Sequence, residues 1–322
     1  MKLFDLSDRK NFVIRPVHDI GFKALMGHKL DPDNLLIKDF LKALFNKDFE
    51  IIEFKDRELT PVQVFGKKIR LDLRLYCQGV YVNLEMQMIP TGNESERALY
   101  YACASMCDQQ LDGKGYDMME SVHQVFLMAE NSSVFTYPFE KYQLYDSQHK
   151  KVLTDKMEIS MISLERIVAR IKDVHAMSDL EKWCLFFCCG HDKDHAGVRV
   201  LLEEERFRKA DLIMRSVNED EELKDAAFQR MKDHLDMITR MKNGMKKATE
   251  EGLARGLEQG LQQGMQQGLE QGLQQGLEQG LEQGIDLEKA NIAKNMKKEN
   301  IDIELVVCQR LPTTTSLFTT RR

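Results

Sequence analysis

Two carboxylates, Asp72 and Glu85, are the residues whose types and spacing most clearly suggest chemistry in this sequence. Each lies in a stretch that alternates apolar and polar residues, and Gln78-Gly79 separates the two stretches. This pattern predicts a β-hairpin with its turn at Gln78-Gly79. The register that this turn implies pairs Arg74 with Asn83. It also places Asp72 across from Glu85, with about 4.5–5.5 Å between their Cβ atoms.

Two carboxylates at this separation repel each other by about 3 kcal/mol at an effective dielectric constant near 20. A divalent metal ion held by oxygen ligands would compensate for this repulsion. In the alternative interpretation, the polar residues of the hairpin form the solvated face of a one-sided sheet. Tyr76, Tyr81 and Ile89 lie on the same polar face and favour a face that is partly covered.

The order of Asp72, and then Glu85-Met86-Gln87 at the end of the next strand, resembles the PD-(D/E)XK nuclease core in its variant with Gln in place of the motif lysine. Further segments are similar to the transposase-like, recombination-promoting nucleases that carry this variant. These segments are residues 19–27, 97–101, 110–116 and 181–183. The similarity extends over roughly residues 12–285, and the order of the motifs makes it more specific than any single motif.

The resemblance implies an α/β fold with a restriction-endonuclease-like core, in which helices flank a central mixed sheet, followed by a mostly helical C-terminal region. It implies a metal-dependent DNA endonuclease associated with transposition or recombination, with Mg²⁺ as cofactor or Mn²⁺ in its place. The metal ligands would be Asp72, Glu85, the carbonyl of Met86 and, as an additional or outer carboxylate, Asp19. Gln87 would position the attacking water, and Lys23 would supply the charge that the motif lysine gives elsewhere.

The net charge of −6 argues against a protein that binds nucleic acid over its whole surface, so DNA contact requires a local basic patch. The candidate DNA-binding residues are Lys67, Lys68, Arg70, Arg74, Arg97 and Tyr101. Lys67 and Lys68 are equally consistent with solvated charges at the ends of the hairpin. The rival function is a catalytically degenerate protein, whose nuclease fold serves as a DNA-binding or self-assembling scaffold.

With 322 residues, of which 43% are hydrophobic, the chain can bury at least one sizeable core. Its apolar periodicity predicts helices at residues 19–27, 34–46 and 94–111, strands at 51–54 and 122–129, extended segments at 137–162, and helices from 164 onward. We expect a nuclease-like domain at 1–163, a helical region at 164–247, a repeat at 248–285, and a short helix with a disordered tail at 286–322.

One segment offers a set of soft metal ligands suited to zinc: Cys184, Cys188, Cys189, His191 and His195. Cys184 and Cys188 are one turn apart in a strongly apolar stretch, which favours a core helix with buried thiols. The odd number of cysteines, seven, indicates a reducing compartment. No apolar run approaches the roughly 20 residues that cross a bilayer, so we expect a cytoplasmic protein with no membrane partner.

Glycine recurs at every fourth position from Gly252 to Gly284, mostly in the pattern Gly-Leu-(Glu/Gln)-Gln. A period of four exceeds the helical 3.6, so the leucine stripe drifts by about 40° per repeat. Each glycine disfavours a helix by about 0.8–1 kcal/mol relative to alanine. Close approach of helices from separate chains could offset this cost. The segment is therefore either the contact of a homo-oligomer through residues 252–284 or a flexible low-complexity linker.

Overall fold

The computed structural model describes residues 9–50, 52–59, 69–109, 111, 113 and 115–298. They divide into two units, of which the first ends at Asp236 and the second begins at Met237. The elements, in chain order, are η1 Arg9–Asn11, α1 Asp19–Met26, α2 Leu35–Phe45, β1 Glu53–Phe54, β2 Glu58–Leu59, β3 Ile69–Arg70, β4 Leu73–Cys77, β5 Val80–Gln87, α3 Glu94–Cys107, η2 Tyr116–Met118, β6 Ser121–Met128, β7 Phe139–Tyr142, β8 Tyr145–Asp146, β9 Lys151–Val152, β10 Met157–Ser163, α4 Leu164–Val168, α5 Asp179–Cys189, α6 Ala196–Leu201, α7 Glu205–Glu219 and α8 Glu221–Lys298.

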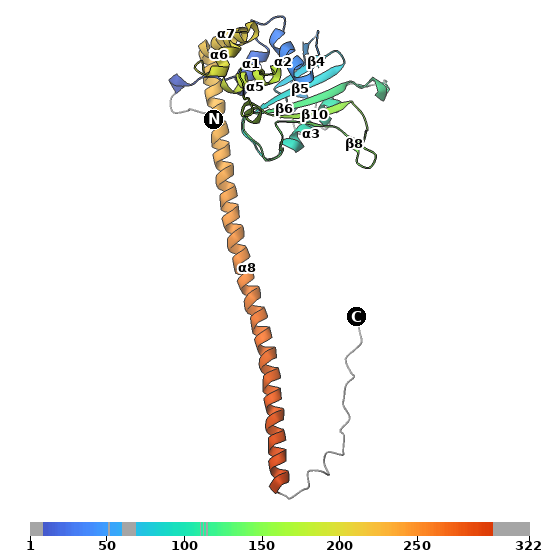
Figure 1. Ribbon diagram of the computed structural model, residues 1–322, viewed down its shortest axis with the longest axis vertical. Coiled ribbons are helices and arrows are strands. Elements are labelled where there is room, and N and C mark those ends of the chain that lie inside the picture. The colour runs from blue at the N-terminus through green and yellow to red at the C-terminus, as the bar shows by residue number, and fades with distance from the viewer. Residues whose placement is uncertain are drawn as a thin grey trace. The chain divides into compact units, whose positions relative to one another are not determined.

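Six strands of the first unit form one mixed sheet in the order β1-β4-β5-β6-β10-β7. The strand β5 pairs antiparallel with β4 and parallel with β6, which in turn pairs parallel with β10. Helices α1, α2 and α5 lie on one side of this sheet and α3 lies on the other (Figure 1). The predicted fold class, a mixed sheet flanked by helices, is therefore confirmed.

The hairpin of β4 and β5 has the predicted turn and register. Gln78 and Gly79 have φ angles of 50° and 88°, and two adjacent positive φ angles are what a type I′ turn requires. Arg74 pairs with Asn83 across the ladder, as the sequence predicts. The strand β4 begins at Leu73, so Asp72 lies immediately before it.

The polar face of the hairpin is buried, which excludes the solvated one-sided sheet. Glu85 and Gln87 are only 5% and 9% exposed, and Asn83 donates a hydrogen bond to Gln124 of β6 at 3.1 Å in the interior. Helix α3 covers this side, where Ala98 packs with Phe126 of the sheet. A buried polar face needs partners for every polar group, so its carboxylates and amides take fixed positions.

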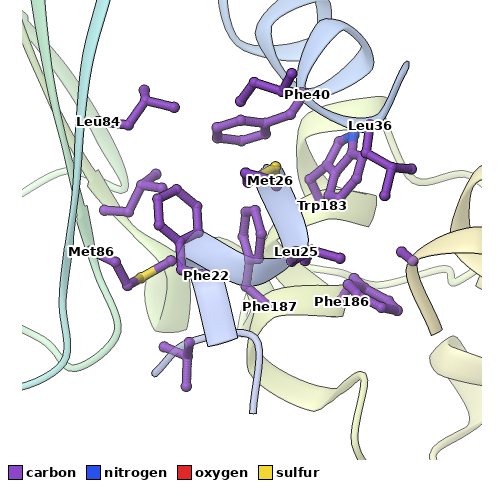
Figure 2. Close-up of a cluster of buried hydrophobic side chains, with 14 of the residues drawn as sticks. Phe22, Leu25, Met26, Leu36, Phe40, Leu84, Met86, Trp183, Phe186 and Phe187 are labelled. Atoms are coloured by element: carbon purple, nitrogen blue, oxygen red, sulfur yellow. The ribbon is translucent and has the colours of Figure 1, made fainter. Parts of the chain in front are cut away.

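The opposite side of the sheet carries the main core, which fixes α1 against β5. Met86 of β5 lies beside Phe22 of α1, and both belong to one cluster of buried apolar side chains (Figure 2). Gly21 permits the close approach of the preceding segment, because a Cβ at this position would lie 2.0 Å from the carbonyl oxygen of Arg15. The packing thus sets the polar residues of α1 next to the strand that carries Glu85.

The cysteine-rich segment forms the buried helix α5. Cys184 and Cys188 are buried in the same cluster as the residues of the sheet. Trp183 anchors α5 to α2, because its Nε1 donates to Asp39 Oδ2 at 2.7 Å. Among the described residues no group of three or more His, Cys, Asp or Glu could hold a metal ion. The burial of both thiols confirms the interpretation as a core helix.

The second unit consists, in its described part, of the remainder of α8, and the whole glycine repeat is helical. A methyl group added at any of the nine glycines would meet no described atom within 4 Å. The leucines of the repeat are 61% to 77% exposed. No helix of the described chain is both long and apolar enough to cross a membrane. The predicted disordered tail lies outside the described residues beyond Lys298.

Candidate active site

The carboxylates of Asp72 and Glu85 each accept a hydrogen bond from a backbone N–H of the other strand end. The backbone N–H of Asp72 donates to Glu85 Oε1 at 2.9 Å, and the backbone N–H of Met86 donates to Asp72 Oδ2 at 2.9 Å. The two side chains are 14% and 7% exposed. The structure therefore brings the two carboxylates together as the hairpin register predicts, although Asp72 itself lies just outside the strand.

Burial makes the negative charge of this pair costly. Burial and the nearby charge of Asp72 raise the pKa of Glu85 to about 8. Burial and the charge of Asp19 raise the pKa of Asp72 to about 6, although Lys23 opposes this shift. Both pKa values are raised, so the protein supplies too little positive charge for this pair, and carboxylate oxygens are the ligands that hard divalent cations prefer. The donor set therefore fits such a cation.

Helix α1 contributes a carboxylate and a cation to this site. Lys23 Nζ forms ion pairs with Asp19 and, at 2.8 Å, with Asp72 Oδ1. Asp19 Oδ2 also accepts a hydrogen bond from Arg230 at 2.7 Å. Burial raises the pKa of Asp19, but Lys23 and Arg230 outweigh it and hold the pKa below its usual value. Asp19 is thus an ionised carboxylate that is already engaged by two cations.

The amide of Gln87 holds an arginine. Gln87 Oε1 accepts from Arg97 Nη1 at 2.8 Å, and Gln87 Nε2 donates to the carbonyl of Ile89 at 2.7 Å. Arg97 Nη2 lies 3.9 Å from Glu85 Oε2. The guanidinium also lies over the rings of Tyr101 and Phe126, with 5.5 Å to each centroid. The oxygen and the nitrogen of the amide thus each bond a protein group. The guanidinium of Arg97 lies beside Gln87, the residue that stands at the position of the motif lysine.

The start of α3 fixes the position of Arg97. The side chain of Glu94 is fully buried and accepts hydrogen bonds from the backbone N–H of Gly92 at 2.9 Å and from Ser132 Oγ at 3.0 Å. It also accepts from the backbone N–H of Thr91. These donors lie outside the helix, so the bonds fasten the preceding loop and Ser132 to the first residue of α3. Arg97, one turn later, is therefore presented by an anchored helix end.

A cavity of about 300 Å³ opens at this site, and we name it the acidic cavity. Its lining includes Asp72, Glu85, Gln87, Arg70, Arg97 and Tyr101. Arg74, in contrast, is 6% exposed, pairs with Asp108 at 2.7 Å and lies over the ring of Tyr81. This burial leaves Arg74 no access to DNA. Lys67 and Lys68 lie outside the described residues.

Three polar residues of the lining escaped the sequence analysis: His18, Arg230 and His234. Arg230 and His234 come from the first turns of α8, some 150 residues after the hairpin. Their spacing of four places them on one helical face with the buried Ala227 and Met231. This spacing was the available signal, but an arginine in a charged helix is equally consistent with a solvated surface.

A mixed sheet flanked by helices, with Asp72 before β4 and Glu85-Met86-Gln87 at the end of β5, agrees with the PD-(D/E)XK class of nuclease folds. The family model described as PD-(D/E)XK nuclease family transposase matches residues 16–244, which is more than half of the chain. The chain therefore belongs to this family, which makes it a nuclease relative of the transposition type. No curated protein and no solved structure matches the chain.

Proposed function

We propose that the protein is a metal-dependent DNA endonuclease, which hydrolyses phosphodiester bonds at the acidic cavity. The observation that carries this proposal is the buried pair of Asp72 and Glu85, whose charges repel each other and lack full compensation within the described chain. Members of the PD-(D/E)XK family generally use divalent metals. Mg²⁺ is our specific expectation, with Mn²⁺ able to substitute for it.

In this proposal Asp72, Glu85 and the carbonyl of Met86 hold the metal ion. A divalent cation bound there would polarise the scissile phosphate and make water a stronger nucleophile near neutral pH. Lys23, through its 2.8 Å contact, lowers the pKa of Asp72 and partly offsets the rise that burial and Asp19 cause. Asp19 positions Lys23 and Arg230 instead of acting as a direct metal ligand, because both cations already contact its carboxylate.

Arg97 is the residue to which we assign the charge of the missing motif lysine. It lies in the cavity lining, next to Glu85, and Gln87 fixes its guanidinium. A guanidinium can bind two oxygens of a phosphate and stabilise the charge that develops in the transition state. Gln87 is then a positioning residue for Arg97, because its Oε1 accepts from Arg97 Nη1 while its Nε2 donates to the carbonyl of Ile89.

The decisive experiment is nicking of supercoiled plasmid by the purified full chain, with Mg²⁺ or Mn²⁺ and with excess chelator. We expect nicking that requires the metal and disappears in the Glu85→Gln variant purified in parallel, which controls for a contaminating nuclease. A wild-type protein that binds plasmid but never nicks it, with either metal, would instead support the degenerate scaffold.

We also propose that residues 252–284 join copies of this chain into a homo-oligomer. The leucine stripe is more than 60% exposed along the entire repeat, and the glycines leave open space beside the backbone. A second helix of the same kind could enter this space and cover the leucines. Because 14 of these 33 residues are Gln or Glu, the partner is a helix in water and not a lipid bilayer.

A further inference from the structure

A second cavity adjoins the acidic cavity and is lined mainly by cations. It has a volume of about 360 Å³ and is lined by Asp19, Lys23, Arg57, Arg70 and Arg230. We name it the basic cavity. Three of its residues, Asp19, Arg70 and Arg230, also line the acidic cavity. Four cations thus surround a space that contains one carboxylate in its lining.

Only part of this positive charge is neutralised by the protein. Lys23 and Arg230 both pair with Asp19, and Lys23 also pairs with Asp72. Arg57 and Arg70 have no ion-pair partner among the described residues. Two guanidinium groups beside a cavity without carboxylate partners repel each other, and an anion between them would relieve this repulsion. Guanidinium groups bind phosphate oxygens in pairs, so phosphate is the anion that fits.

Backbone hydrogen bonds hold the segments that carry Arg57 and Arg70. The backbone N–H of Leu71 donates to the carbonyl of Arg57 at 2.9 Å. Arg70 lies in β3, where it is directly opposite Glu58 of β2 in an antiparallel pair. The third arginine, Arg230, lies in a helix. Arg70 and Arg230 thus lie in regular elements, and Arg57 is joined to the residue after Arg70 by a backbone hydrogen bond, which fixes where these charges lie.

We propose that the basic cavity binds the DNA phosphate that neighbours the scissile one on the same strand. This inference rests on the proposed function, because Lys23 links the two cavities: it lines the basic one and contacts Asp72 of the acidic one. The phosphate could be a bridging diester within a continuous strand or a terminal monoester at a strand end. The first source defines an enzyme that cuts within DNA, and the second defines one that recognises DNA ends.

The test is DNA binding measured without cleavage, by fluorescence anisotropy of a labelled duplex with the Glu85→Gln variant as background. We expect Arg57→Gln and Arg70→Gln each to weaken binding about tenfold at low salt. Each should also reduce the slope of log affinity against log salt by about 0.9, the loss of one phosphate contact. The matched control is Arg170→Gln, which removes an exposed arginine that lies outside both cavities.

Two sets of duplexes distinguish the sources of the phosphate. One set is continuous through the binding site, and the other ends there with a phosphate or a hydroxyl. Weakening by Arg57→Gln on the continuous duplex supports a bridging diester, whereas weakening confined to the phosphorylated end supports a terminal monoester. If both variants bind every duplex with the affinity and salt slope of the Arg170→Gln control, the inference is wrong. Failure of the wild-type protein to nick plasmid would overturn the proposed function alone, because this binding test involves no cleavage.

Discussion

The two units of the chain differ in the exposure of their apolar side chains. In the first unit the large apolar residues of α1, α2 and α5 pack into a common core, and Trp183 and Phe187 are completely buried. In the second unit every leucine of the repeat is at least 61% exposed. Helices of the first unit are stabilised by packing, which is the usual source of helical stability in proteins. The repeat has no such packing within the described chain and carries nine unfavourable glycines.

The two units also differ in where their charged side chains lie. In the first unit, carboxylates and cations lie together at the acidic cavity, where burial raises the pKa values of Asp72 and Glu85. In the second unit, ion pairs such as Lys246–Glu250 lie on the surface of the helix. Exposed pairs of this kind contribute little. Substitutions in the first unit should therefore change chemistry, and substitutions in the second should change assembly.

The largest effect is expected from the two carboxylates. Glu85→Gln and Asp72→Asn should each lower the nicking rate at least about a thousandfold, because each removes a ligand of the proposed metal. Both variants should remain folded, since removing one of two buried like charges relieves repulsion. The matched control, Glu96→Gln, changes an exposed residue of α3 and should cleave at the wild-type rate. Wild-type rates in either cavity variant would contradict the proposed site.

The second effect is a charge exchange at Gln87 and Arg97. Arg97→Gln should lower the nicking rate about a hundredfold, as expected for loss of a cation that stabilises the transition state. Gln87→Lys should also lower the rate, because its ammonium would lie beside the guanidinium that now contacts Gln87 at 2.8 Å.

The double variant Gln87→Lys/Arg97→Gln restores one cation and should recover much of the rate. If Gln87→Lys alone is more active than the wild-type protein, Arg97 does not carry the charge of the missing lysine. Recovery in the double variant cannot arise from two independent losses, so it distinguishes a shared charge from two separate structural defects.

The hairpin could be predicted because its determinants are local. Gln78-Gly79 sets the turn, the turn sets the register, and the register brings Asp72 to Glu85. The order of motifs then indicated the fold class. These features need only neighbouring residues and a pattern of alternation, so sequence alone was sufficient for them.

The partners of the polar side chains could not be predicted, because they depend on how distant elements pack. Nothing near Gln87 in the sequence indicates that Arg97 occupies its amide, since this contact depends on where α3 begins. Arg74 follows the same polar alternation as its neighbours, yet Asp108 holds it in the interior. Arg230 reaches the site only because α8 packs against α1 through contacts such as the one with Asp19.

The third effect is a pH dependence of stability in the absence of metal. At Asp72 and Glu85 the folded protein binds more protons than the unfolded chain, because folding raises their pKa values to about 6 and about 8 from their usual 3.8 and 4.5. The stability from these groups is therefore present below about pH 4 and is lost as the pH rises toward 8. We expect the melting temperature of the metal-free protein to fall over this range.

The stabilisation by Mg²⁺ should grow over the same range, since the metal replaces the protons. Differential scanning fluorimetry with and without metal measures both effects. In Glu85→Gln the dependence between about pH 6 and 8 should be reduced, because the group with the higher pKa no longer titrates. A metal-free stability that rises with pH in the wild-type protein but not in this variant would contradict the assignment.

Substitutions in the repeat are expected to have the smallest effect on the first unit. They should instead change the molar mass of the assembly. Leu→Gln substitutions at positions 257, 261, 269 and 273 remove the apolar stripe without changing chain length or glycine content. They should lower the molar mass measured by light scattering, while the first unit still melts at its wild-type temperature. A mass identical to that of the wild-type protein would mean that the helix is a solitary spacer.

Gly→Ala substitutions at Gly260, Gly264 and Gly268 sharpen this test, because they separate helix formation from helix association. Each should stabilise an isolated helix by about 0.8–1 kcal/mol, since no described atom lies where the new methyl groups would be. If the helices approach each other across these glycines, the same methyl groups should keep them apart and lower the mass. Greater helicity with lower mass therefore supports the homo-oligomer. Greater helicity with unchanged mass means that the glycines are not at the contact.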